Sequence, residues 1–135
     1  TVLNFNNDNQ FNVKVDIQDA ALNTIHLAAR VDFLVVPPKI NKQMVLTDIF
    51  LYTIVFIEVE SDGKGLELAC LQLLTSLKAI AHFIGKRTLY GIVISADFSQ
   101  AQVLKHDHHG CFKNGTFHPS QLGSVATHIL NGHLQ

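Results

Sequence analysis

Several residue types are rare in this sequence. Tryptophan is absent, and the 135 residues include only two tyrosines, three prolines and two cysteines. Two cysteines, Cys70 and Cys111, cannot build the disulfide framework of a small secreted protein, so an intracellular, reducing setting is favoured. The scarcity of Trp and Tyr also leaves few stacking surfaces for single-stranded nucleic acid, although nine phenylalanines are present.

The sequence also lacks long apolar runs and an excess of basic charge. No stretch reaches the roughly 18 uninterrupted apolar residues of a membrane helix. The opening TVLNFNNDNQ shows no signal-peptide pattern, so we expect no membrane association. A net charge of −1 gives no general attraction to nucleic acid, but it leaves local phosphate contacts open.

The composition that remains is that of a globular protein. A length of 135 residues with 47% hydrophobic residues predicts a single domain spanning 1–135. The large apolar share leaves room for a partner surface, either a homodimer face or a contact with a neighbouring domain. Because the chain opens at Thr1 without Met, we also expect it to be a piece of a longer protein.

Hydrophobic patterning predicts five strands and two helices. Alternating or continuous apolar residues predict strands at 12–17, 31–36, 53–60, 88–95 and 101–106. Helical spacing predicts a long helix over 66–84 that ends at Gly85, and a final helix over 120–130 capped by Ser120.

The rest of the chain gives weaker signals. Segments 19–29 and 44–50 are compatible with more than one type of element, whereas 1–10 and 106–115 are expected to be loops. The order of elements predicts an α/β (α+β) fold with a central mixed sheet flanked by helices. The short connection from 31–36 to 53–60 permits antiparallel pairing, and the long helix then allows 88–95 to lie parallel to 53–60.

Three carboxylates fall at one predicted end of this sheet. Asp32 begins one strand, and Glu58 and Glu60 end the next, two residues apart and therefore on one face. Carboxylates that meet in a low dielectric repel one another, and a hard divalent cation such as Mg²⁺ relieves that repulsion. The pattern predicts a Mg²⁺ or Mn²⁺ site at Asp32, Glu58 and Glu60, with Asp48 as an alternative to Asp32.

This arrangement resembles the PD-(D/E)XK nuclease superfamily. The stretches ARVDFLVV and FIEVES look like its Asp strand and its (D/E)-X-K strand, and GLELACLQLLTSLKAI is similar to the helix that follows. TLYGIVISADFSQAQVL resembles its last strand pair, so the likeness covers residues 31–105. It implies a restriction-endonuclease-like core and metal-dependent hydrolysis of phosphodiester bonds in DNA or RNA.

The resemblance also implies roles for individual residues, with two departures. Glu60 stands where the family has Lys, so Glu60 would act as a base or metal ligand, and Lys64 is the candidate for the missing cation. Gln72 matches the Gln of a QxxxY motif in some branches, with Ser76 in place of Tyr. Glu60, Gln72 and Lys64 are therefore the candidate catalytic residues.

Two other functions remain open from the sequence. The lost Lys, the near-neutral charge and the apolar composition favour a catalytically inactive scaffold that serves protein interaction or dimerisation. The segment LKHDHHGCF, with His106 to Cys111, contains metal-capable residue types but fits no structural zinc spacing. It would be the site of a small α/β binding protein unrelated to nucleases.

Overall fold

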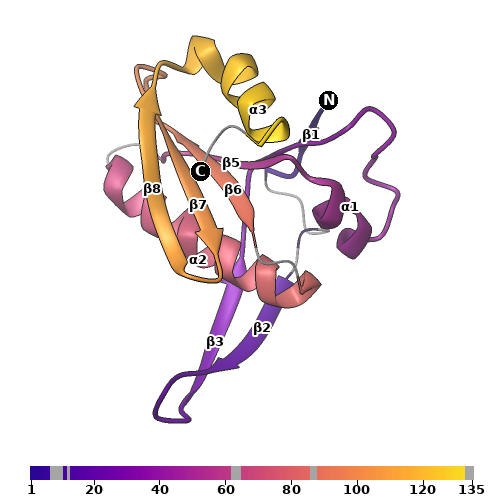
Figure 1. Cartoon of the computed structure of the whole chain (residues 1–135), viewed down its shortest axis with the longest axis vertical. Coiled ribbons are helices and arrows are strands. Elements are labelled where there is room, and N and C mark those ends of the chain that lie inside the picture. The colour runs from indigo at the N-terminus through magenta and orange to yellow at the C-terminus, as the bar shows by residue number, and fades with distance from the viewer. Residues whose placement is uncertain (7–10, 12, 62–64, 86–87, 133–135) are drawn as a thin grey trace.

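A computed structural model describes residues 1–6, 11, 13–61, 65–85 and 88–132. Over these residues the fold is α+β, with a six-stranded mixed sheet flanked by helices (Figure 1). The strands are β1 (Val2–Asn4), β2 (Val13–Gln18), β3 (Thr24–Ala29), β4 (Phe33–Val35), β5 (Val55–Val59), β6 (Leu89–Ile94), β7 (Ala101–Asp107) and β8 (Gly110–Phe117). The helices are α1 (Leu46–Tyr52), α2 (Leu66–Ile84) and α3 (Leu122–Leu130), with a 3₁₀ turn at Pro119–Gln121.

The sheet has the strand order β1-β4-β5-β6-β7-β8. As predicted, β4 and β5 are antiparallel, and α2 returns the chain so that β6 lies parallel to β5. The remaining neighbours in the sheet are antiparallel. Strands β2 and β3 form a separate hairpin that packs against α2 and extends beyond the sheet (Figure 1).

Helix α2 forms because its apolar residues recur at helical spacing, and it ends as predicted at Gly85 in the left-handed conformation. Its inner face covers the sheet, where Leu73 and Leu77 are fully buried. Gly91 of β6 lies directly beneath, so that a Cβ there would meet Leu73 Cδ2 at 2.8 Å. By length and mean hydropathy α2 could also cross a membrane, but a buried helix of a globular protein meets the same criteria.

The two faces of the sheet carry separate cores. On one face Phe56, Val93 and Leu104 pack with α2. On the other face Ile57, Ile92 and Val103 join a smaller cluster that includes Ile129 of α3. Since side chains alternate along a strand, even-numbered residues of β5 and β7 face α2, and odd-numbered residues face α3.

Three predicted features of local structure were wrong. The expected loop at 106–115 contains most of β8, an edge strand whose many exposed residues gave no alternating apolar signal. Part of the expected loop at 1–10 is β1, which has only three residues and pairs with β4. Ser120 is not a cap: the His118 ring accepts the Ser120 N–H at the start of the 3₁₀ turn, and α3 begins at Leu122.

The two ambiguous segments are resolved by their surroundings. Residues 24–29 form strand β3 because they pair along their length with β2. Residues 46–52 form helix α1, whose Ile49 and Phe50 are buried in the core beneath α2. In both places tertiary packing selected between two conformations that the local sequence permitted.

Candidate metal and phosphate site

Asp32 is fixed across the junction of β4 and β5. Phe33 pairs with Ile57, and the Asp32 N–H donates to the Ile57 carbonyl at 3.1 Å, so Asp32 lies beside Glu58. The Asp32 carboxylate also accepts the Val59 N–H at 2.9 Å. The predicted meeting of one strand's start with the other strand's end is therefore present for Asp32 and Glu58.

Glu58 occupies an unfavourable environment for a carboxylate. It faces α2, and its Oε2 is buried without a hydrogen-bond partner among the residues that the structure describes. Burial, and then the nearby charge of Asp32, raise the pKa of Glu58 from 4.5 to about 7. Burying a carboxylate oxygen without a hydrogen bond costs free energy. A bound cation would remove much of that cost.

The two carboxylates open into a hollow with a volume of about 500 Å³, called here the carboxylate hollow. The α2 side contributes the exposed Gln72 together with Thr75, and Asn6 lies on the N-terminal side. Gln72 was predicted to belong to the site, and the structure brings it to the same hollow as Asp32 and Glu58. Its amide offers both a donor and an acceptor there.

Arg30 is a residue of this hollow that sequence reasoning missed. It is the second residue of the stretch ARVDFLVV, and it lines the hollow two residues before Asp32. Ser76, on the buried side of α2, holds its backbone: Ser76 Oγ accepts the Arg30 N–H at 3.1 Å and donates to the Arg30 carbonyl at 3.0 Å. A basic residue two positions from the candidate Asp was the signal available in the sequence.

The other predicted site residues lie elsewhere. Glu60 lines a separate hollow of about 370 Å³ with Asp97 and Ser99, and its N–H donates to the Ile94 carbonyl at 2.8 Å. Lys64 lies outside the described residues. Asp48 is exposed in the first turn of α1 and does not line the carboxylate hollow.

The histidine-rich segment forms part of a third hollow, of about 650 Å³. His106, Asp107 and His108 meet Lys78 and His82 of α2 there. In the described part of the chain, no three His, Cys, Asp or Glu side chains are grouped so as to hold a metal ion. Cys111 is exposed and Cys70 is buried, as its place in the helical pattern predicted.

A second buried polar side chain lies in line with Glu58 across the sheet. The register places Glu58 opposite Val93, Val93 opposite Gln102, and Gln102 opposite Thr116. Strand β8 bulges here, since Asn114 and Gly115 both stand against Val103.

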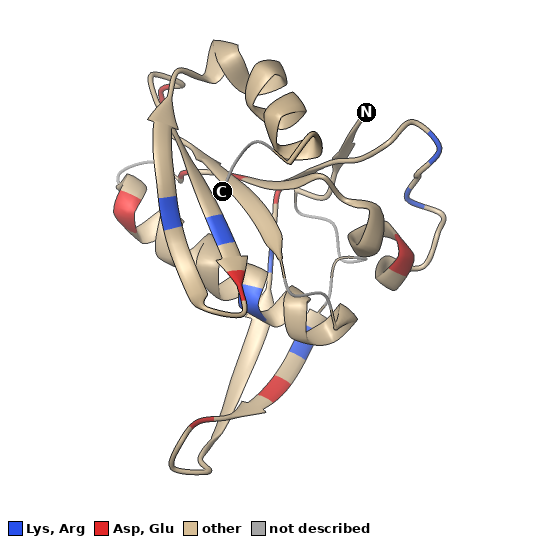
Figure 2. Ribbon diagram, viewed as in Figure 1, with Lys and Arg blue, Asp and Glu red and all other residues tan. Residues whose placement is uncertain are grey.

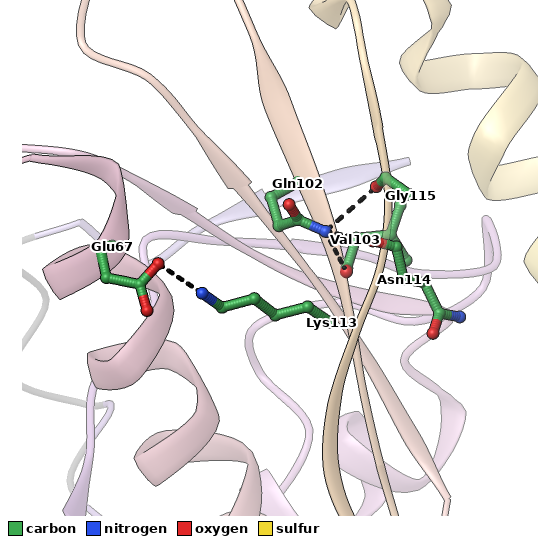
Figure 3. A network of polar contacts seen from close by, with 6 residues as sticks. All are labelled: Glu67, Gln102, Val103, Lys113, Asn114 and Gly115. Atoms are coloured by element: carbon green, nitrogen blue, oxygen red, sulfur yellow. Dashed lines mark hydrogen bonds and ion pairs between the residues drawn. The ribbon is translucent and has the colours of Figure 1, made fainter.

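The Gln102 amide fills this bulge (Figure 3). It donates to the carbonyls of Val103 at 3.0 Å, of Gly115 at 3.2 Å and of Asn114. Nearby, the exposed Lys113 forms an ion pair with Glu67 at the start of α2. The face of the sheet that carries the carboxylate hollow thus also carries the Gln102 hydrogen bonds. Gln102 does not line the hollow and stabilises the bulge instead.

Comparisons with known proteins assign no family and no function to this site. No protein-family model, no curated protein and no solved structure matches this chain. Basic and acidic residues are interspersed over the described ribbon, in keeping with the near-zero net charge (Figure 2). The local grouping of Asp32, Glu58, Arg30 and Gln72 is therefore the feature with the clearest chemical meaning.

Proposed function

We propose that this chain is a PD-(D/E)XK-like nuclease domain that hydrolyses phosphodiester bonds in DNA or RNA with Mg²⁺ or Mn²⁺. The observation that carries the proposal is the Glu58 carboxylate. It has a buried oxygen to which no described residue hydrogen-bonds, a raised pKa, and Asp32 beside it in an open hollow. Structural carboxylates are normally paired or solvated, so this arrangement favours a cation as the missing partner.

The residues present fit a Mg²⁺ site in which the protein supplies only two of the ligands. Mg²⁺ is commonly bound by one or two carboxylates, with waters and substrate phosphates completing its octahedron. Asp32 and Glu58 supply two carboxylates, so a group of three protein ligands is not required. A bound cation would lower the pKa of a water molecule and neutralise charge on the phosphate.

The chain's own side chains then have distinct roles. Asp32, whose carboxylate accepts the Val59 N–H, and Glu58 would hold the cation, and its charge would favour the ionised form of Glu58. The Gln72 amide orients water or a phosphate oxygen by hydrogen bonding. Glu60, although it lines a separate hollow, is proposed as a base or second ligand, and Lys64 as the basic residue that the resemblance expects. Both roles are proposals that substitution can test.

The topology supports the same proposal. An Asp strand antiparallel to a Glu strand, then a helix, then a strand parallel to the second, is the order that the resemblance implies. This support is weaker than that of the site, because one fold hosts many functions.

The experiment is a calorimetric titration of Mn²⁺ into the wild type, Asp32→Asn and Asp48→Asn. We expect micromolar to sub-millimolar binding that Asp32→Asn abolishes and Asp48→Asn preserves, because Asp48 is a carboxylate outside the hollow. The same proteins are then incubated with labelled DNA and RNA in Mn²⁺. Absence of Mn²⁺ binding in the wild type, or equal binding in Asp32→Asn, would refute the metal site. Glu60→Gln in the same series decides whether Glu60 takes part.

A second candidate is the inactive scaffold that acts as an interaction or homodimerisation module. Two observations favour it: Glu60 replaces the family's Lys, and Leu68 and Leu71 are about half exposed on α2. This candidate predicts a mass in light scattering that rises with protein concentration, with no Mn²⁺-dependent shift in Tm. The nuclease proposal predicts the Tm shift, and Glu58→Gln should abolish it.

A further inference from the structure

Arg30 is held in place more firmly than an ordinary exposed arginine. Both of its backbone polar groups bond to the single hydroxyl of Ser76, which is buried on α2. Its Cα is therefore fixed relative to both the helix and the start of β4. Only Val31 separates it from Asp32, and both residues line the same hollow.

The guanidinium of Arg30 is not used to neutralise the buried carboxylate. Among the described residues, neither the Glu58 nor the Asp32 carboxylate forms an ion pair with the guanidinium. Yet Arg30 lines the same hollow as Asp32, Glu58 and Gln72. A cation whose backbone is held in place, and which does not pair with the adjacent carboxylates, is available to a ligand that is itself an anion.

We propose that Arg30 binds the non-bridging oxygens of a substrate phosphate in the carboxylate hollow, and that Ser76 is its positioning residue. This inference rests on the proposed function for its substrate, a nucleic acid phosphodiester. The planar guanidinium donates two parallel hydrogen bonds to a phosphate, which a lysine ammonium cannot do. Arg30 thus supplies the positive charge that the resemblance expects at position 60, where this chain has Glu60.

The geometry also explains why Ser76 stands where some branches of the family have Tyr. A larger side chain at this buried position could not accept from the Arg30 N–H and donate to its carbonyl in the same way. Gln72 lies one turn earlier on α2 and lines the same hollow. The helix therefore brings an amide to the hollow and, through Ser76, fixes the backbone of Arg30 beside it.

The test uses fluorescence anisotropy of a labelled 12-nucleotide DNA, with inorganic phosphate as competitor, first in EDTA and then in Mn²⁺. The proteins are the wild type, Arg30→Gln, Arg30→Lys, Ser76→Ala and the control Lys39→Gln, which removes an exposed charge outside the hollow. In EDTA we expect Arg30→Gln to weaken DNA and phosphate binding about tenfold and Arg30→Lys about threefold. Lys39→Gln should change the affinity less than about twofold.

Two further readouts separate phosphate binding from a structural role. Arg30→Gln should reduce the slope of log affinity against log salt by about 0.7, the value for one lost contact to single-stranded DNA. Ser76→Ala should weaken binding while leaving the slope unchanged, because the contact still forms. Arg30→Gln should also bind Mn²⁺ slightly more tightly, since a neighbouring positive charge has been removed.

The outcomes distinguish this inference from the proposed function. Wild-type-like DNA and phosphate binding by Arg30→Gln, or no measurable binding by the wild type in EDTA, would overturn the role of Arg30. Neither result concerns Mn²⁺ binding by Asp32 and Glu58, which is decided by the calorimetric titration. A loss of Mn²⁺ binding together with a lower Tm in Arg30→Gln would show a structural role instead, and would also overturn the inference.

Discussion

The two faces of the sheet are built from the same strands but differ in kind. Toward α3 the buried cluster consists of aliphatic side chains, with Ile57, Ile92 and Val103 at its centre. Toward α2 the core is larger and rich in phenylalanine, and it borders three polar groups: the Glu58 carboxylate, the Gln102 amide and the Ser76 hydroxyl. Two of these have partners inside the protein. Glu58 has a buried oxygen for which the described residues offer none.

The difference shows how a candidate site can be found from packing and hydrogen bonding alone. Apolar packing accounts for the buried side chains of the cluster on the α3 face, because each of them gains from leaving water. On the α2 face, Gln102 and Ser76 are explained by their hydrogen bonds to backbone groups. Glu58 remains unexplained by packing or by hydrogen bonding, and a residue of that kind is where a ligand is expected.

The largest effects should come from the apolar cores, and they should be similar on the two faces. We expect Leu77→Ala on the α2 face and Ile92→Ala on the α3 face each to reduce the free energy of unfolding by about 3 kcal/mol, because both side chains are fully buried. Urea denaturation measures both. A loss below about 1 kcal/mol for Ile92→Ala alone would mean that α3 packs loosely on the sheet.

The next effect should appear only on the α2 face, as a dependence of stability on pH. Since the pKa of Glu58 is raised from 4.5 to about 7, folding disfavours its charged form. Stability should therefore be greatest below pH 4.5 with respect to this group, fall as the pH rises toward 7, and then level off. After allowance for screening by solvent, the loss should be roughly 2 kcal/mol.

Glu58→Gln should remove this pH dependence, because it has no ionisable group at that position. Unfolding midpoints measured in urea across the pH range would show the wild type and variant converging in acid and separating near neutrality. Saturating Mn²⁺ should flatten the wild-type profile in the same way if it binds Glu58. If the stability of the two proteins instead changed in parallel with pH, the pKa of Glu58 would be the same in the folded and unfolded states. The two faces of the sheet would then differ less in polarity than proposed.

A smaller effect should distinguish a buried polar contact from an exposed one. Gln102→Leu removes the hydrogen bonds from the buried amide to the backbone of β8, so we expect the free energy of unfolding to fall by about 1.5 kcal/mol. The control is Glu67→Gln, which breaks the exposed pair with Lys113 and should cost less than about 0.5 kcal/mol. Equal losses in thermal denaturation would mean that water replaces the Gln102 amide in the bulge.

Much of the sheet could be predicted from the sequence because its central strands carry strong apolar runs. The segments at 31–36, 53–60 and 88–95 contain β4, β5 and β6, and α2 was predicted at its observed bounds. The edge strands β1 and β8 were missed because an edge strand is held mainly by backbone hydrogen bonds, which leave little trace in side-chain type.

The candidate site was predictable only as far as strand register extends. The pairing of β4 with β5 brought Asp32 to Glu58, as the order of elements indicated. The separation of Glu60 into another hollow depends on how the chain leaves β5, which no local pattern encodes. The position of Arg30 depends on a hydrogen bond to Ser76, 46 residues further along the chain, and contacts at that separation follow only from the packed structure.

Gly91 has a consequence for the seat of α2 on the sheet. Because this residue has no side chain, Leu73 and Leu77 rest directly on the backbone of β6, where an alanine Cβ would lie 2.8 Å from Leu73 Cδ2. Leu73 stands beside Gln72 in the helix, and Gln72 and Ser76 both line the carboxylate hollow. The absence of one side chain on β6 thus creates the space into which the helix carrying these two polar residues is fitted.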